Sequence, residues 1–157
     1  MSFQQVKTFF EEQNLGHRVQ EFDVSSATVE LAAAAVGCEP ARIAKTLSFS
    51  LDGGAVLIVA AGDAKINSSK YKAQFGAKAT MLTPSQVEEL VGHSVGGVCP
   101  FCTKPGVSVY LDISLQRFES VYPACGSSNS AVCLTQKELL DCSGSLGWVD
   151  VCKGWTD

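Results

Sequence analysis

Five consecutive residues, Gly96-Gly97-Val98-Cys99-Pro100, are the part of the chain best suited to hold a ligand through main-chain atoms. Two adjacent glycines permit a tight turn in which backbone N–H groups approach a bound molecule closely. Pro100 fixes the exit of the turn and donates no hydrogen bond. Main-chain donors arranged in this way bind a carbonyl oxygen or a phosphate. This GxxxP loop is therefore a candidate binding site. Which ligand it would bind depends on the other side chains that lie near it.

Lys45 is the candidate charged partner of the loop. It begins a strand-like segment in which alternation places it on the same face as Leu47 and Phe49. The opposite face carries hydroxyl side chains: Thr46, Ser48 and Ser50. Because burial of an unpaired ammonium is costly, Lys45 either extends to water from the strand end or points into a pocket. In a pocket it would bind an anionic or carbonyl group.

Cys99 and Cys102 form a CxxC motif within and beside the same loop. The motif is half of a zinc site, a redox pair, or two ordinary thiols in a tight loop. His93 and Cys125 could complete a zinc site, but neither belongs to a second knuckle, and a redox motif usually opens a helix. Ordinary thiols are the favoured interpretation, so we expect no metal and no cofactor. We expect His93 at the surface, with a place at a pocket rim as the alternative.

A second loop of small residues, Cys125–Ser130, joins two predicted strands. It is either a simple turn or a pocket wall whose hydroxyl and amide groups contact a ligand.

Length and composition limit the possible classes of protein. The 157 residues suffice for one domain with a sizeable core, which we expect to span residues 1–157. A hydrophobic share of 46% and a charged share of 18% exclude a disordered chain. The net charge of −4 offers no overall basic stripe, so we expect no DNA partner. A modest basic cluster is either a solvated helix face or a contact for a few phosphates: Lys65, Lys70, Lys72 and Lys78.

Targeting signals and cysteine usage point to the cytoplasm. No apolar run is long enough to span a membrane, and Ala55–Ala61 is at most a buried strand. The segment Met1–Gln5 lacks the basic and apolar regions of a secretory signal. Seven cysteines, an odd number, argue against a disulfide framework. We therefore expect reduced thiols, a cytoplasmic location and no membrane partner.

Hydrophobic periodicity and turn residues predict interspersed helices and strands. Helices are expected over 2–13, from Ser25 or Ser26 to Gly37, from Asn67 to Gly76, from Thr83 to Gly92, and after Thr135. Strands are expected over 17–22, 44–51, 55–61, 79–82, 107–111, 120–123, 131–134 and 146–152. The sequence Asp52-Gly53-Gly54 predicts a hairpin between two of them. These elements predict an α/β fold of the α+β type, with a mixed, partly closed β-sheet and surrounding helices.

Three segments of the chain carry a combined pattern. They are Ile43-Ala44-Lys45-Thr46-Leu47-Ser48-Phe49, preceded by Gly37; Val95-Gly96-Gly97-Val98-Cys99-Pro100-Phe101; and Val109-Tyr110-Leu111-Asp112, leading to Val121-Tyr122-Pro123-Ala124-Cys125-Gly126. In this order they resemble the YbaK/ProX family of trans-acting aminoacyl-tRNA deacylases, whose module also occurs as the editing insertion of bacterial prolyl-tRNA synthetases. The resemblance covers nearly the whole chain, and its most specific marks are the lysine of the KTL strand and the GxxxP loop.

The resemblance implies a YbaK-like editing fold whose pocket receives the 3′ end of a mischarged tRNA. It implies hydrolysis of the ester between a wrong amino acid, cysteine or alanine, and the terminal ribose, typically on proline tRNA. Lys45 is the implied catalytic residue. The implied substrate-binding residues are Ser25, Thr28, Gly96, Gly97, Val98, Cys99, Pro100, Gly126 and Asn129. Some relatives have an acidic residue shortly after the second loop, where this chain has Ala131 and Val132.

The chemistry of these residues agrees with ester hydrolysis. Main-chain donors at 96–99 could stabilise a developing oxyanion, and Lys45 could hold a phosphate or ester oxygen. No side chain is an obvious strong base, so we expect a positioned water or help from the substrate's own groups. Expected partners are the aminoacyl-tRNA acceptor end and a synthetase such as prolyl-tRNA synthetase. The alternatives are a non-catalytic module that binds tRNA or a synthetase, and a thiol-redox or zinc protein.

Overall fold

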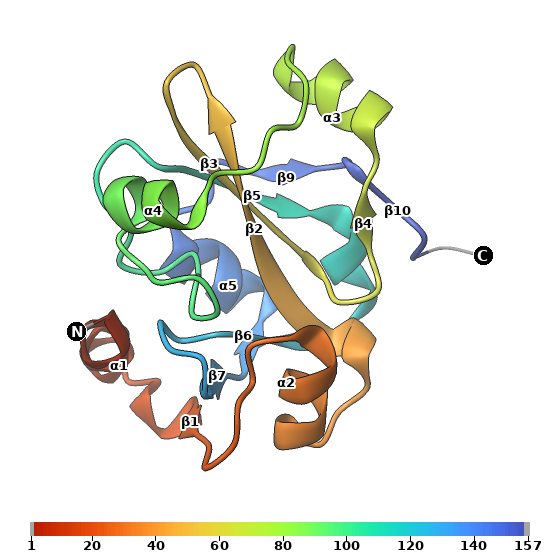
Figure 1. Ribbon diagram of the computed structural model, residues 1–157. Coiled ribbons are helices and arrows are strands. Elements are labelled where there is room, and N and C mark those ends of the chain that lie inside the picture. The colour runs from red at the N-terminus through yellow and green to blue at the C-terminus, as the bar shows by residue number, and fades with distance from the viewer. Residues whose placement is uncertain (1, 156–157) are drawn as a thin grey trace.

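The computed structural model of the protein describes residues 2–155, which form a curled, mixed β-sheet with helices packed around it (Figure 1). The sheet has six strands in the order β8-β6-β2-β3-β5-β9. Their bounds are β2 Ile43–Leu51, β3 Gly54–Ala61, β5 Ser108–Asp112, β6 Ser120–Pro123, β8 Leu134–Thr135 and β9 Trp148–Val149. Both parallel and antiparallel pairs occur, which confirms the predicted mixed α+β architecture.

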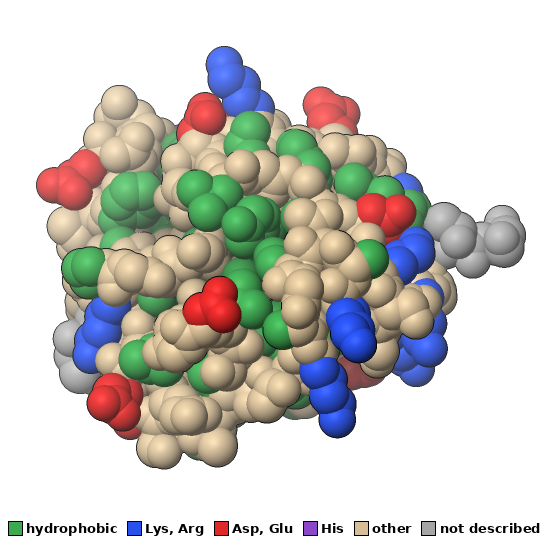
Figure 2. Space-filling model, turned by 90° about the horizontal axis from the view of Figure 1, so that it is seen from above, with side chains coloured by type: hydrophobic (Ala, Val, Ile, Leu, Met, Phe, Trp, Pro, Cys, Tyr) green, Lys and Arg blue, Asp and Glu red, His purple; other side chains and the backbone are tan. Residues whose placement is uncertain are grey.

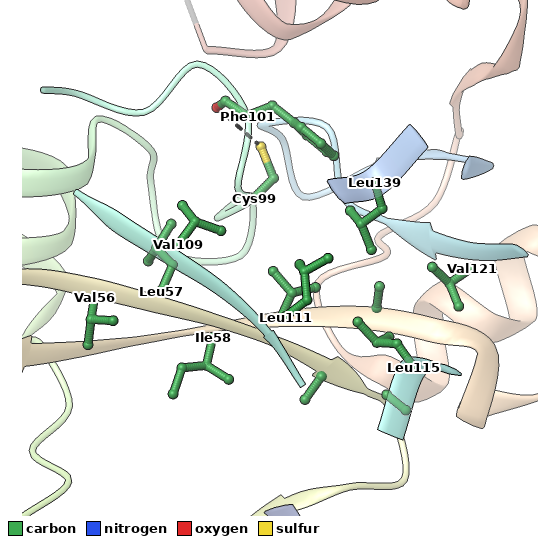
Figure 3. Packing of buried hydrophobic residues seen from close by; sticks show 14 of the residues in the cluster. Val56, Leu57, Ile58, Cys99, Phe101, Val109, Leu111, Leu115, Val121 and Leu139 are labelled. Atoms are coloured by element: carbon green, nitrogen blue, oxygen red, sulfur yellow. Dashed lines mark hydrogen bonds between the residues drawn. The ribbon is translucent and has the colours of Figure 1, made fainter. Parts of the chain in front are cut away.

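The long hairpin of β2 and β3 is the centre of this sheet. Asp52 and Gly53, with φ of 52° and 80°, make the turn that the sequence predicted. Residues 55–61 of β3 are all at most 7% exposed, because this strand has neighbours on both edges and is covered on both faces. Figure 3 shows Leu139 of a C-terminal helix pointing toward Leu111 of β5 within this core.

Two small antiparallel ladders lie outside the main sheet. β1 (Val19–Glu21) pairs with β7 (Ser130–Val132), and β4 (Lys65–Ile66) pairs with β10 (Cys152–Lys153). The strand predicted over 131–134 is therefore two strands, β7 and β8, in different sheets. The strand predicted over 146–152 is likewise β9 followed separately by β10. In both segments two short strands form instead of one, because each part of the segment pairs with a different strand.

Five α-helices surround the sheet within the described residues: α1 Ser2–Glu12, α2 Val29–Val36, α3 Ser68–Phe75, α4 Pro84–Gln86 and α5 Gln136–Ser143. α4 continues as a π-helical turn over Val87–Val91, and 3-10 turns occupy Gly16–Arg18, Pro40–Arg42 and Ile113–Arg117. Both predicted capping boxes, at Thr83 and Thr135, are present. The cap of α2 was predicted wrongly: Thr28, rather than Ser25 or Ser26, accepts the Leu31 N–H.

One edge of β2 is left open in its middle, and this gap positions the site. β6 pairs with β2 only through Ile43 and Ala44. Farther along, the main chain of residues 80–82 takes over that edge: Ser50 N–H donates to Thr80 O (2.8 Å) and Leu82 N–H donates to Ser48 O (3.2 Å). The strand expected over 79–82 is thus only an isolated bridge between Met81 and Phe49. Between these two contacts, Thr46 has no strand partner on this edge.

Candidate functional site

A cavity of about 310 Å³ lies against the open edge of β2. Its walls come from four places: residues 44–48 of β2, the start of α2, the segment from Met81 to Val87, and the GxxxP loop with its neighbours in β6 and β7. Figure 1 shows α2 near the start of β2 and α4 beside its upper half, and residues of both helices line the cavity. The gap in the sheet therefore becomes a binding pocket rather than a paired strand.

Lys45 lines this cavity, and main-chain carbonyls hold its ammonium. Lys45 Nζ donates to the carbonyl oxygen of Ala64 and, at 3.4 Å, to that of Gly62. An ammonium has three N–H donors, so one remains for a ligand. Burial lowers the pKa of Lys45 below its ordinary value of 10.5. Lys45 is therefore neither a solvated lysine nor an unpaired one, because two main-chain carbonyls hold this half-buried cation.

The GxxxP loop reaches the same cavity through Gly96 and Val98. Gly96 has φ of +97°, a conformation that side-chain-bearing residues rarely adopt. Gly97 N–H is not available to a ligand, since it donates to Ser94 O at 3.0 Å. Among the described residues, the N–H groups of Gly96 and Val98 have no acceptor. Two loop residues that line the cavity thus keep main-chain N–H groups without an acceptor, whereas Gly97 does not.

Gly97 fixes the loop against the second small-residue loop. A Cβ on Gly97 would lie 2.7 Å from Ser127 N and 2.8 Å from Gly126 C, both main-chain atoms. Only a glycine permits this close approach. Gly97 is therefore a positioning residue that holds Gly96 and Val98 at the cavity wall.

The remaining predicted substrate-binding residues divide into two groups. Thr28 lines the cavity, although its hydroxyl is occupied in capping α2. Ser25, Gly97, Cys99, Pro100, Gly126 and Asn129 lie outside the cavity lining. Asn129 Nδ2 donates to Phe22 O at 3.0 Å, and Gly126 O accepts from Ser2 Oγ at 2.6 Å. These contacts brace the second loop against the N-terminal segment instead of facing the pocket.

The cysteines of the CxxC motif lie in different environments. Cys99 is fully buried beneath the loop, and its thiol points toward the Phe101 carbonyl (3.8 Å; Figure 3). Burial raises the pKa of Cys99 to about 12, so the reactive thiolate is scarce near neutral pH. Cys102 is half-buried, and its thiol lies 3.8 Å from Gln5 O. Within residues 2–155, no group of three or more His, Cys, Asp or Glu side chains is placed to hold a metal ion.

His93 is buried, contrary to the surface position expected from the sequence. It is 1% exposed, and Nε2 lies 2.7 Å from Phe101 O and 3.6 Å from Cys99 Sγ. Burial lowers the pKa of His93 below 6.5, which keeps the ring neutral with Nε2–H donating to Phe101. His93 therefore ties together the two ends of the GxxxP loop from beneath.

Several cavity residues escaped the sequence analysis. They are the hydroxyl side chains Ser26, Thr46 and Ser48 and the exposed apolar side chains Met81 and Val95. Ser130, which belongs to the loop that the sequence offered as a possible pocket wall, lines the cavity as well. The alternation that put Thr46 and Ser48 on one face of a strand was a usable signal, because both residues line the cavity. Met81 and Val95 are 61% and 60% exposed, which no local pattern foretold.

Basic side chains gather on one side of the face that Figure 2 shows. Hydrophobic side chains lie at the middle of this face, and several Lys and Arg side chains lie toward its right. In the predicted basic cluster, Lys70 is paired with Asp150 at 3.0 Å. Lys65, Lys72 and Lys78 have no ion-pair partner among the described residues. The cluster therefore offers three cations to a polyanion.

Fold and cavity together define a class of protein: an α+β domain whose cavity is lined by one lysine and by residues of a glycine-rich loop. No Asp, Glu or His side chain lines the cavity among the described residues. No helix in that part of the chain has the length and apolar character needed to cross a membrane.

Comparisons with known proteins give this class its identity. A model of the aminoacyl-tRNA editing domain matches residues 23–142, and the chain belongs to this family. The uncharacterized protein YwhH of Bacillus subtilis (strain 168) is 54% identical over 156 residues, covering 99% of both chains. A crystal structure of a candidate trans-editing enzyme for prolyl tRNA synthetase superimposes with a TM-score of 0.86 and 32% identity, covering 98% of both chains.

The editing module also occurs within larger enzymes. Proline–tRNA ligase of Lysinibacillus sphaericus (strain C3-41) is 32% identical over 94 residues, which are 59% of this chain and 16% of the ligase. The chain thus corresponds to a small part of that synthetase. Membership in the family connects the protein with aminoacyl-tRNA editing and translation fidelity.

Proposed function

We propose that the protein is a trans-acting aminoacyl-tRNA deacylase, which hydrolyses the ester between a wrong amino acid and the 3′-terminal ribose of tRNA. The observation that carries the proposal is the meeting of Lys45, Gly96 and Val98 at one cavity in a chain of the editing family. The proposed substrates are small aminoacyl groups, cysteinyl or alanyl, on proline tRNA. The whole of residues 1–157 acts as one domain in the cytoplasm.

Charge stabilisation is the proposed source of catalysis. Water attacks the ester carbonyl and the carbonyl oxygen becomes an oxyanion. The N–H groups of Gly96 and Val98 donate to that oxygen, and the third N–H of Lys45 holds a neighbouring ester or phosphate oxygen. Preorganised donors of this kind contribute on the order of 10²–10³ each to the rate.

The open edge of β2 supplies a further contact. Alternate residues of a strand direct their N–H and C=O groups to the same edge, so Thr46 shares the edge used by Ser48 and Ser50. We place the α-amino group of the substrate at Thr46 O, an acceptor that suits a cation. Because no acidic or histidine side chain among residues 2–155 lines the cavity, the water is activated by position or by substrate groups such as the ribose hydroxyl.

The apolar rim and the basic cluster suit the acceptor end of tRNA. Met81 and Val95 can stack against unpaired terminal bases, and Lys65, Lys72 and Lys78 can meet a few phosphates. A net charge of −4 suits contact with a short end of the tRNA rather than with its full length. Prolyl-tRNA synthetase, which holds the same tRNA, is the proposed partner.

A panel of mischarged tRNAs tests the proposal and separates catalysis from binding. Purified protein should release the amino acid from at least one mischarged tRNA and leave correctly charged prolyl-tRNA intact. Binding is measured on the same samples by filter retention. Retention without release on every tRNA of the panel would establish the non-catalytic binding module instead.

A further inference from the structure

A short turn that begins with the last residue of β3 holds the ammonium of Lys45. This carbonyl turn comprises residues 61–64, and Ala64 N–H closes it by donating to Ala61 O at 2.9 Å. The carbonyl oxygens of Gly62 and Ala64 both accept from Lys45 Nζ. The contacts that fix the carbonyl turn therefore also fix the position of the Lys45 ammonium.

The side chain at the middle of the carbonyl turn is held by an arginine from a distant part of the chain. Arg117 Nη1 donates to Asp63 Oδ2 at 2.9 Å, and Arg117 Nη2 donates to Asp63 Oδ1 at 2.5 Å. Two parallel bonds of this kind fix both the distance and the orientation of a carboxylate. The bonds from Arg117 also lower the pKa of Asp63 below its ordinary value of 3.8. Because Asp63 lies between the two residues whose carbonyls hold Lys45, this ion pair fixes the turn at its centre.

Arg117 is itself held by several further contacts. Its Nε donates to Ser114 O and its Nη1 to Trp155 O, each at 3.0 Å. The guanidinium carbon lies 5.0 Å from the centre of the Phe118 ring and 5.1 Å from that of the Trp155 ring. Ser114 Oγ accepts from Ala61 N–H at 3.1 Å, so the segment that carries Arg117 contacts the carbonyl turn at a second point. The guanidinium is thus a fixed support for the turn.

We propose that Arg117 is a positioning residue for deacylation, which acts on the Lys45 ammonium through Asp63 and the carbonyl turn. Neither Arg117 nor Asp63 lines the cavity, so their effect on the reaction passes through Lys45. A displaced carbonyl turn would move the third N–H of Lys45 away from the oxygen that it holds. A misplacement approaching 1 Å lowers a rate by up to about 10²-fold. The inference rests on the proposed deacylase function.

Arg117→Gln and Asp63→Asn test the inference, because each removes one charge of the ion pair and keeps a polar side chain. Single-turnover deacylation of a mischarged tRNA that the wild-type protein hydrolyses is measured over a range of protein concentrations. Each variant should lose about tenfold in the maximal rate, while the protein concentration that gives half this rate stays close to the wild-type value. In a Lys45→Ala background neither substitution should lower the rate further, because the residue through which both act is gone.

Arg18→Gln is the matched control. Arg18 forms a comparably exposed ion pair with Glu138: its side chain is 32% exposed, and that of Arg117 is 28% exposed. Urea denaturation checks that every variant is folded, and Arg18→Gln should keep the wild-type rate. Wild-type rates in folded Arg117→Gln and Asp63→Asn, or an equal further loss in the Lys45→Ala background, would overturn the inference and leave the deacylase proposal standing. Absence of deacylation by the wild-type protein on every mischarged tRNA would refute both.

Discussion

Gly97→Ala is the substitution that tests how the two small-residue loops shape the cavity wall. The new Cβ would lie 2.7 Å from Ser127 N, and both loops must separate by about 0.7 Å to restore an ordinary 3.4 Å contact. Neighbouring atoms here belong to the main chain, so no flexible side chain can give way. Overpacking of this kind costs about 1–3 kcal/mol in the free energy of unfolding.

The same displacement of the loop should also lower the rate of deacylation. Gly96 and Val98 flank Gly97 and carry the two main-chain donors at the cavity. A misplacement approaching 1 Å lowers the rate by as much as 10²-fold. We therefore expect Gly97→Ala to remain folded and to lose roughly 10- to 100-fold in kcat/KM for deacylation.

Chemical denaturation and single-turnover deacylation measure these two effects on one preparation. Gly54→Ala is the control, because Gly54 has no positive φ and its nearest contact, Leu51 O, is at 3.7 Å. The control should stay within about 0.5 kcal/mol of wild type. A Gly97→Ala protein with wild-type stability and wild-type rate would refute the role assigned to this close approach.

Three further predictions follow from the electrostatics of the protein. Burial lowers the pKa of His93 below 6.5, so the unfolded state binds more protons and the free energy of unfolding should fall as the pH drops from 6.5 toward the folded pKa. His93→Gln should reduce this pH-dependent loss of stability, as measured by urea titrations at several pH values. An equal pH dependence in both proteins would contradict the prediction. Cys99, with a pKa of about 12, should resist alkylation by iodoacetamide in the native protein at pH 8, as measured by peptide mass mapping. Rapid labelling of Cys99 would contradict this prediction and support a thiol-redox function. If three lysines contact phosphates, tRNA affinity measured by fluorescence anisotropy should fall about 40-fold between 50 and 200 mM salt, whereas a flat response would remove the basic cluster from the interface.

Local signals in the sequence were sufficient for most of the fold. The hairpin at Asp52 and Gly53 and the capping boxes at Thr83 and Thr135 depend on neighbouring residues, and all formed as predicted. Partner exchange is a long-range property, so the division of residues 131–134 between β7 and β8 could not be predicted. The bridge at Met81 arises in the same way, because it depends on an edge that β6 leaves open.

The candidate site was predicted less completely, for a physical reason. Residue types identified Lys45 and the GxxxP loop, but not which atoms of the loop face the ligand. The bond from Gly97 N–H to Ser94 and the contacts of Asn129 with Phe22 depend on three-dimensional packing. Ser48 was visible only as part of a hydroxyl face, since the rest of the cavity lining comes from distant segments of the chain.

The central claim, that the cavity at Lys45 is an ester-hydrolysis site, is tested most directly by Lys45→Ala. Deacylation of a mischarged tRNA that the wild-type protein hydrolyses is measured under single-turnover conditions, beside Lys137→Ala, an exposed lysine away from the cavity lining. We expect Lys45→Ala to lose on the order of 10²–10³ in rate with its fold retained in circular dichroism, and Lys137→Ala to stay within a few-fold of wild type. A folded Lys45→Ala protein that deacylates at the wild-type rate would contradict the account.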